Sequence, residues 1–211
     1  MPIDSKIQVL TNHYDFTNYV TWERWQSYYY QIKMILKSGV KSVLFVGPGD
    51  GIVVTALRQA GLEVDTIDID SSLNPDLLGS VLELEKSTTK RYEGVACFQV
   101  LEHLPHDQFK LALSEIRKCS KRCVFLSLPY RSFRLFHVSL KFHNIPIIFF
   151  KMVFPLFFQK FKFDGEHYWE IGSKGHSLNQ TKKEITEIFE IVRSEHISGN
   201  PYHYSFELKL K

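Results

Sequence analysis

The chain of 211 residues has little cysteine, no secretory leader pattern and no histidine pair at a usual metal-binding spacing. Its three cysteines, Cys97, Cys119 and Cys123, are odd in number, and CxxxC is not a usual zinc or redox pattern. We therefore expect reduced thiols in a cytoplasmic protein rather than a disulfide scaffold. The opening residues lack a basic start followed by an apolar stretch, so no signal peptide is predicted. Nine histidines without HxxxH or HxH spacing predict no metal site.

The sequence also lacks internal repeats, low-complexity linkers and a strong net charge. A charge of +3 is too small to indicate nucleic-acid binding by itself. With 44% hydrophobic and 23% charged residues, the chain has the composition of a soluble globular protein. We expect a single domain over residues 1–211, divided by changes of pattern into an N-terminal helical cap (1–40), a core (41–130), an insertion (131–178) and a C-terminal helix and hairpin (179–211).

Short apolar runs alternate with helical patterns through the core. Val43–Val46 suits a strand buried on both faces, as parallel strands are. Alternating strands and helices predict an α/β protein, with a mostly parallel sheet and helices on both faces. The expected elements are helices within 15–37, a strand at 43–46, a helix at 52–60, strands at 62–68 and 95–100, a helix at 107–119, a strand at 123–128, a helix at 181–189, and strands at 191–197 and 202–210 that close the sheet as an antiparallel hairpin.

A glycine-rich loop, Gly47-Pro48-Gly49-Asp50-Gly51, directly follows the first expected strand and opens a helix. Glycines there let the backbone approach a ligand, and the helix N-terminus offers unpaired N–H groups. Ile52 stands where the third glycine of a dinucleotide fingerprint would be. Asp68 lies at the end of the second strand, where a carboxylate can accept hydrogen bonds from both hydroxyls of a ribose. Together these features predict a nucleoside ligand.

At these residues the sequence resembles the class I S-adenosylmethionine-dependent methyltransferases. The matching strings are VLFVGPGDG (43–51), VDTIDID (64–70), PDLLGSV (75–81), YEGVACFQVLEHLP (92–105) and VFLSLPY (124–130), of which VLEHLP is the most specific. The resemblance implies a seven-stranded Rossmann-like sheet, S-adenosylmethionine as cofactor and S-adenosylhomocysteine as product. It also implies methionine near the glycine loop, ribose on Asp68 and adenine near Ile69, Val81 and Phe98-Gln99. The cofactor-binding residues so predicted are Gly47, Pro48, Gly49, Asp50, Gly51, Asp68, Ile69, Ser80, Val81, Phe98 and Gln99.

The sequence departs from the family's pattern at two positions. Phe45 stands where the family usually has an acidic residue that helps to hold the methionine ammonium, and Ser80 stands where an acidic residue often meets the adenine amino group. Our hypothesis is that Asp50 or the backbone substitutes at the first position, with a lower affinity for the cofactor.

Two histidines are candidates for a general base, which is needed only when the acceptor must lose a proton. His103 follows the fourth strand of the core at the carboxyl edge of the sheet, where open α/β folds place ligands. His167 lies in the polar aromatic string GEHYWE. The alternatives are a loop-organising role for His103 and a surface turn for His167.

Residues 131–163 contain six lysines or arginines, no acidic residue and ten of the seventeen phenylalanines. The apolar run 145–158 is too short to span a bilayer. Three interpretations stay open for this insertion: a helical cap over the active site, a peripheral membrane contact through 145–163, and a homodimer interface. The family commonly inserts substrate-recognition structure at this position, which favours the cap.

The predicted acceptor is a small molecule or a lipid- or glycan-linked molecule. Trp25 and Tyr29, four residues apart on one helical face, and Tyr168 are the predicted substrate-binding residues. An RNA or protein methyltransferase is the rival enzyme class, but the phenylalanines are embedded in aliphatic sequence, which disfavours nucleic acid. A methyltransferase-like scaffold that has lost its cofactor is the non-enzymatic alternative.

Overall fold

The computed structural model describes residues 11–140, 142–144, 148–156 and 158–211. Parts of the predicted cap (1–10) and of the predicted insertion (141, 145–147 and 157) lie outside the described residues. The helices are α1 (Phe16–Tyr19), α2 (Trp22–Ser38), α3 (Ile52–Gln59), α4 (Leu84–Ser87), α5 (Phe109–Cys119) and α6 (Leu178–Ile188). The strands are β1 (Ser42–Val46), β2 (Glu63–Asp68), β3 (Leu77–Leu78), β4 (Tyr92–Phe98), β5 (Ser120–Pro129), β6 (Ser132–Leu140), β7 (Ile148–Pro155), β8 (Phe189–Ile197) and β9 (Asn200–Leu210).

Seven strands form one sheet in the order β3-β2-β1-β4-β5-β9-β8. The strands from β3 to β5 pair in parallel, and β9 pairs antiparallel with both β5 and β8. The predicted Rossmann-like sheet and its closing antiparallel hairpin are therefore confirmed. Because β1 lies between β2 and β4, the chain reverses direction of winding there, which opens a crevice at the carboxyl ends of these strands.

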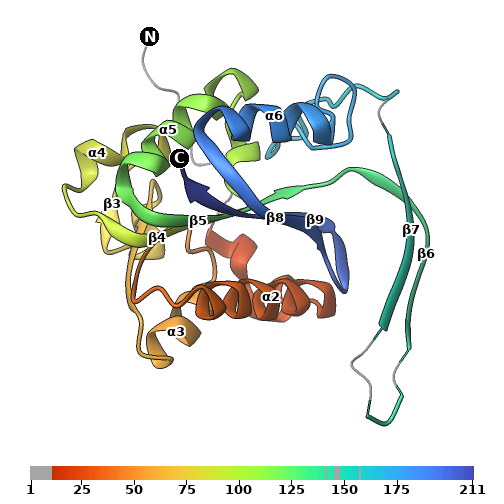
Figure 1. Ribbon diagram of the computed structural model, residues 1–211, viewed down its shortest axis with the longest axis horizontal. Helices are drawn as coiled ribbons and strands as arrows, with labels where there is room; N and C mark the ends of the chain where they lie inside the picture. Colours follow the sequence, from red (N-terminus) through yellow and green to blue (C-terminus); the bar gives the residue numbers. More distant parts are fainter. Residues whose placement is uncertain (1–10, 141, 145–147, 157) are drawn as a thin grey trace.

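Helices cover both faces of the sheet: α2 and α3 on one side, α5 and α6 on the other (Figure 1). Alternate residues of β1 supply the two cores, since successive strand side chains point to opposite faces. Leu44 and Val46 pack with Phe109 of α5, whereas Val43 and Phe45 belong to the core under α2 and α3. The near-continuous apolar sequence of β1 is what burial on both faces requires.

Helix α2 has a capping residue at each end. Thr21 caps its N-terminus, with its hydroxyl accepting a hydrogen bond from the backbone N–H of Arg24. Gly39 ends it in the left-handed region, at a φ of 73°. The helix therefore ends one residue beyond the helical range 15–37 that the sequence predicts.

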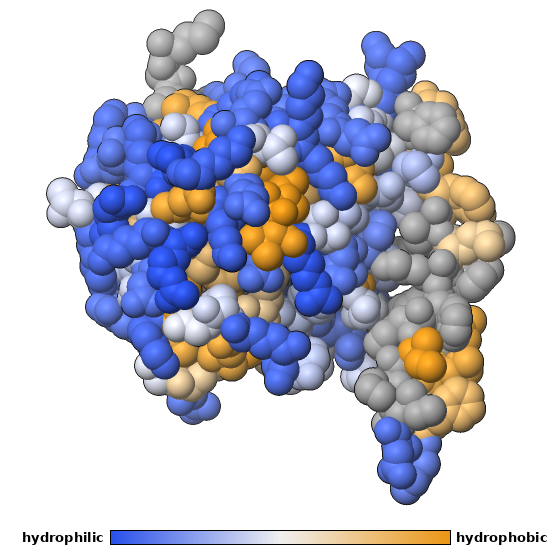
Figure 2. Space-filling model, viewed as in Figure 1, coloured by the Kyte–Doolittle hydropathy of each residue, from blue (hydrophilic) through white to orange (hydrophobic). Residues whose placement is uncertain are grey.

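The insertion differs from its prediction. A helical cap was expected at 131–178, but the described residues of its first part form the antiparallel hairpin β6–β7. Helical structure after the fifth strand is α6, which begins at Leu178. The apolar run has no 3.6-residue period, and its β-branched and aromatic residues suit a pleated ribbon. The hairpin extends away from the main sheet and carries exposed apolar side chains on the face in view (Figure 2).

None of the helices in the described part of the chain has the length and apolar character needed to cross a bilayer.

Candidate functional site

A cavity of about 180 Å³ opens at the carboxyl ends of β1, β2 and β4, beneath the N-terminal helices. Its floor comes from the loops that follow these strands, and its wall from α2 and the segment before it. This is the crevice at which open α/β sheets bind their ligands. Eight of the predicted cofactor-binding residues line it: Gly47, Pro48, Gly49, Asp50, Asp68, Ile69, Phe98 and Gln99.

The glycines of the loop are required by conformation and by space. Gly47 and Gly49 have φ values of 71° and 55°, which disfavour any side chain. A Cβ on Gly47 would lie 2.4 Å from Cγ2 of Val100, and one on Gly49 would lie 3.3 Å from the Tyr14 ring. The loop therefore presents bare backbone to the cavity and opens α3 behind it.

Asp68 ends β2 at the cavity, with one carboxylate oxygen accepting a hydrogen bond from the backbone N–H of Asp70 at 2.9 Å. Burial raises the pKa of Asp68, and the Asp70 charge adds to this against the hydrogen bond from the Asp70 backbone, which lowers it. A half-buried carboxylate at this place has one oxygen held and can accept further hydrogen bonds from a ligand.

Gln99, directly after β4, has an unusual backbone for a residue other than glycine, with a φ of 55°. Two contacts to Ser127 of β5 hold it: its backbone N–H donates to the Ser127 carbonyl at 3.0 Å, and its side-chain amide donates to the Ser127 hydroxyl at 3.0 Å. Strained backbone that is held so firmly is typical of functional positions. After this turn, Val100 and His103 line the cavity.

The wall of the cavity is aromatic and polar, and it includes Tyr19 and Tyr28. Tyr28 donates a short hydrogen bond to the Asp50 carboxylate, so α2 is tied to the glycine loop. Arg24 donates to the Tyr19 hydroxyl at 2.7 Å. Phe45 lies at the cavity with only 3% of its surface exposed and packs edge-on against Phe98. Asp50 lines the same cavity as Phe45, and our hypothesis that Asp50 substitutes for the missing acid stays a prediction.

Three predicted cofactor residues are not among the described residues that line the cavity: Gly51, Ser80 and Val81. Gly51 begins α3 at a φ of 75°. Ser80 caps a short turn, accepting a hydrogen bond from the Leu82 N–H, and Val81 is buried in the core. Their predicted contacts with the cofactor stay predictions.

The predicted substrate residues lie elsewhere than expected. Trp25 is 47% exposed, and Tyr29 lines a second cavity on the outer side of α2, with Lys33 and Arg193. Tyr168 packs against Phe163 at a ring separation of 4.6 Å. None of the three is among the described residues that line the first cavity. A different face of α2 lines this cavity, and substrate binding by Trp25, Tyr29 and Tyr168 stays a prediction.

The face of α2 that does line the cavity carries Arg24, Ser27, Tyr28 and Gln31, at the spacing i, i+3, i+4 and i+7 of one helical stripe. Ser27, Tyr28 and Gln31 are buried, and the stripe continues into the core at Ile35. In the sequence, polar residues continue the apolar stripe of this helix toward its N-terminus, and this pattern could have predicted these residues. His203 of β9 lines the cavity next to them, with Nδ1 3.0 Å from the Ser27 hydroxyl, and no local pattern predicted it.

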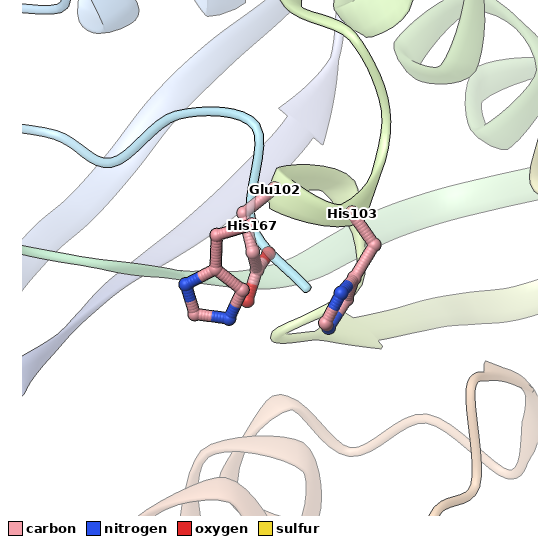
Figure 3. A group of neighbouring side chains, drawn as sticks. All are labelled: Glu102, His103 and His167. Carbon is pink, nitrogen blue, oxygen red and sulfur yellow. The ribbon is translucent and has the colours of Figure 1, made fainter. Parts of the chain in front are cut away.

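His103, which lines the cavity, lies close to the other predicted catalytic histidine, His167, and to Glu102 (Figure 3). His103 and Glu102 lie in the short turn Leu101–His103 after β4, and His167 comes from the segment that returns to the sheet after the hairpin. The rings of His103 and His167 are edge-on, with their centres 5.0 Å apart. The two segments are joined by the Tyr168 backbone N–H, which donates to the Glu102 carbonyl at 2.9 Å.

Both histidines have their Nδ1 atoms committed. Nδ1 of His103 lies 2.9 Å from the Glu166 carbonyl, and Nδ1 of His167 lies 3.0 Å from a carboxylate oxygen of Glu170. Burial lowers the pKa of His103, and the neighbouring His167 charge lowers it further. Burial also acts to lower the pKa of His167, but the hydrogen bond to Glu170 and the Glu102 charge raise it on balance. Burial raises the pKa of Glu102 to about 8.

The family of the chain is decided by a comparison of its sequence with family models. A model described as a methyltransferase domain matches residues 30–169, which is well over half of the chain. The chain belongs to this methyltransferase family. The predictions of a class I, S-adenosylmethionine-dependent methyltransferase and of its cofactor are thereby confirmed. A search among curated proteins finds no match to the sequence.

Solved structures with this fold include several methyltransferases. The magnesium protoporphyrin IX methyltransferase ChlM from Synechocystis, with bound S-adenosylhomocysteine, superposes with a TM-score of 0.60 at 15% identity, covering 90% of this chain and 84% of that one. The N-methyltransferase NodS from Bradyrhizobium japonicum, also in complex with S-adenosylhomocysteine, gives 0.59 at 12% identity, covering 89% and 87%. The glycopeptide N-methyltransferase MtfA gives 0.58 at 14% identity, covering 86% and 95%. At these identities the likeness concerns the fold.

Proposed function

We propose that this methyltransferase, as a single domain, transfers the methyl group of S-adenosylmethionine to a small molecule or to a lipid- or glycan-linked acceptor. The observation that carries the proposal is the single cavity shared by the glycine loop, Asp68 and the polar aromatic stripe of α2. In it the glycine loop and Asp50 hold the methionine end of the cofactor, Asp68 holds the ribose, and Ile69 and Phe98 contact the adenine.

The reaction is an in-line displacement: the bond from sulfur to the methyl carbon breaks, its electron pair stays on sulfur, and a lone pair of the acceptor forms the new bond. The protein therefore has to align the two reactants and exclude water. Tyr19, Tyr28 and His103 surround the remaining part of the cavity and contact the acceptor in this proposal. His103 and His167 mark the acceptor's end of the cavity.

A lipid-linked acceptor is favoured by the exposed apolar ribbon of β6 and β7. Phe133 and Phe154 are 56% and 51% exposed and face each other across the two strands. The segment 131–163 has six basic residues and no acidic one, which suits contact with anionic headgroups. In the proposal this ribbon rests on a membrane surface and brings the acceptor to the adjoining site.

The first experiment is calorimetric titration of the purified protein with S-adenosylhomocysteine. We expect micromolar binding that is lost in Gly49→Val. Methyl transfer from labelled S-adenosylmethionine to lipid extracts and to small-molecule fractions then identifies the acceptor class. Absence of binding would contradict the proposal and support the scaffold alternative.

A further inference from the structure

The cluster of Glu102, His103 and His167 has a feature that neither the cofactor nor a general base explains. Glu102 is fully buried, with 0% of its surface exposed, and neither of its carboxylate oxygens has a hydrogen-bond partner among the described residues. A buried acid without a partner is costly, and buried polar groups are hydrogen-bonded in the great majority of cases. Two buried carboxyl oxygens without a partner, facing two histidines, are the observation that points to a ligand at this cluster.

The three side chains converge on one point. One ligand atom from each of Glu102, His103 and His167 can be chosen such that all lie within 4.8 Å of one another (Figure 3). A transition metal at about 2.1 Å from each ligand places neighbouring ligand atoms about 3 to 3.5 Å apart. Side-chain movements of about an ångström therefore bring the three atoms to bonding distance of a common centre.

The hydrogen bonds behind the histidines prepare them to be ligands. A backbone carbonyl and a carboxylate only accept, so Nδ1 of His103 donates to Glu166 and Nδ1 of His167 donates to Glu170. In the neutral imidazole the lone pair is then on Nε2. Metal-binding histidines almost always donate their other ring nitrogen in this way, which fixes the ring and raises its basicity. Glu170 is itself held, because it accepts a hydrogen bond from the Tyr202 hydroxyl.

We propose that Glu102, His103 and His167 bind a divalent transition-metal cation at the acceptor's end of the cavity. Two imidazoles and one carboxylate on one side of a cation leave further coordination positions open. His103 lines the cavity, so these positions are directed toward it. There the cation binds an oxygen of the acceptor, a consequence that rests on the proposed function, whereas cation binding itself does not. The proposal replaces the prediction that the chain has no metal site.

The test uses the full chain, stripped of metal with a chelator and titrated with Mn²⁺ alone. Electron paramagnetic resonance measures the free Mn²⁺, and pulsed measurements detect nitrogen nuclei coupled to the bound ion. We expect one Mn²⁺ per chain with coupling from imidazole nitrogen, and competition by Zn²⁺. Failure of Mn²⁺, Co²⁺ and Zn²⁺ to bind up to millimolar concentrations would overturn the proposal.

Two variants and a matched control locate the site. Glu102→Gln and His167→Gln should each weaken Mn²⁺ binding by more than about tenfold. His143→Gln, at an exposed histidine near the tip of the hairpin, should bind Mn²⁺ as the unaltered protein does. Equal Mn²⁺ binding in all four proteins would place the ion elsewhere and overturn the assignment.

Thermal unfolding separates loss of the site from loss of the fold. Without metal, Glu102→Gln should unfold at the same temperature as the unaltered protein or higher, since the amide buries no charge. Added Mn²⁺ should raise the unfolding temperature of the unaltered protein but not that of the variant. If Glu102→Gln gains the same stability from Mn²⁺ as the unaltered protein does, Glu102 is not a ligand.

The two proposals can fail separately. Gly49→Val should lose S-adenosylhomocysteine binding and keep Mn²⁺ binding, because the glycine loop lies outside the cluster. Glu102→Gln should lose Mn²⁺ binding and keep S-adenosylhomocysteine binding.

Discussion

Tyr28 donates a hydrogen bond from its hydroxyl to the carboxylate of Asp50, and this one contact joins the N-terminal helix α2 to the glycine loop. Asp50 also accepts a hydrogen bond from the backbone N–H of Ile52 at 3.1 Å, which fixes the first turn of α3. The acid of the loop is therefore held between two helices.

Tyr28→Phe removes the hydroxyl and leaves the ring. We expect the affinity for S-adenosylhomocysteine to fall by about tenfold, because a hydrogen bond to a charged group contributes about 1.5–3 kcal/mol and water replaces part of it. Calorimetric titration measures the change. Tyr29→Phe, at the neighbouring and exposed tyrosine, is the control and should bind as before. Equal affinities for the two variants would show that the Tyr28 contact does not prepare the loop.

Gly49→Val should lower the affinity for S-adenosylhomocysteine by at least about tenfold. The new side chain meets the Tyr14 ring and requires a φ of 55°, which a β-branched residue rarely adopts. Gly61→Ala is the matched control, since Gly61 also has a positive φ, of 88°, but a Cβ there meets nothing within 4 Å. We expect Gly61→Ala to lower the stability of the protein and to leave its affinity for S-adenosylhomocysteine unchanged. Loss of binding in both variants would indicate a general effect of backbone strain.

Because the hairpin β6–β7 exposes apolar side chains, we expect the protein to bind anionic vesicles at low salt. Flotation measures this binding. The double variant Phe133→Ser with Phe154→Ser should weaken this binding by at least about tenfold, because each buried phenylalanine contributes about 1.5–3 kcal/mol. Leu111→Ser, at an exposed apolar residue of α5 that is 46% exposed, is the control. Flotation that is absent in the unaltered protein, or unchanged in the double variant, would remove the membrane from the proposed function.

His203 predicts a loss of stability in acid. Burial, with the charges of Arg24 and His167 acting in the same direction, lowers the pKa of His203 to about 3 from an ordinary value of 6.5. Between these pH values the unfolded chain binds a proton that the folded protein does not, so the free energy of unfolding falls as the pH falls. The contribution is at most about 1.4 kcal/mol per pH unit.

His203→Gln removes this proton and should flatten the dependence of the unfolding free energy on pH between about 6.5 and 4. Urea unfolding at several pH values measures the slope. His143→Gln, at an exposed position, should retain the slope of the unaltered protein. A slope that His203→Gln leaves unchanged would assign the acid sensitivity to other groups.

By itself the sequence determined the parts whose signals are local. The apolar run at β1, the glycines after it and Asp68 after β2 predicted strand, loop and carboxylate at the right residues. A parallel sheet brings the ends of its strands to one edge, so the order of these motifs along the chain was sufficient to place them in one cavity.

Only the tertiary structure decided which side chains complete the site. Helix α2 could present Trp25 and Tyr29 or Arg24, Ser27 and Tyr28 to the sheet, and the packing of Ile35 into the core selected the second face. The insertion was expected to be a helical cap because of its position in the family. An apolar run without a clear period does not distinguish a helix from a ribbon, so the sequence could not reveal the hairpin.

The cluster at Glu102 shows the same limit at longer range. His103 is its neighbour in sequence, but His167 comes from 65 residues further along. The segment of His167 is held there by the hydrogen bond from the Tyr168 backbone N–H to the Glu102 carbonyl. No spacing rule for metal ligands covers such a pair, which is why the histidines were predicted singly as bases. Local sequence patterns predicted the part of the cavity at the glycine loop and Asp68, and long-range packing determined the part at His103.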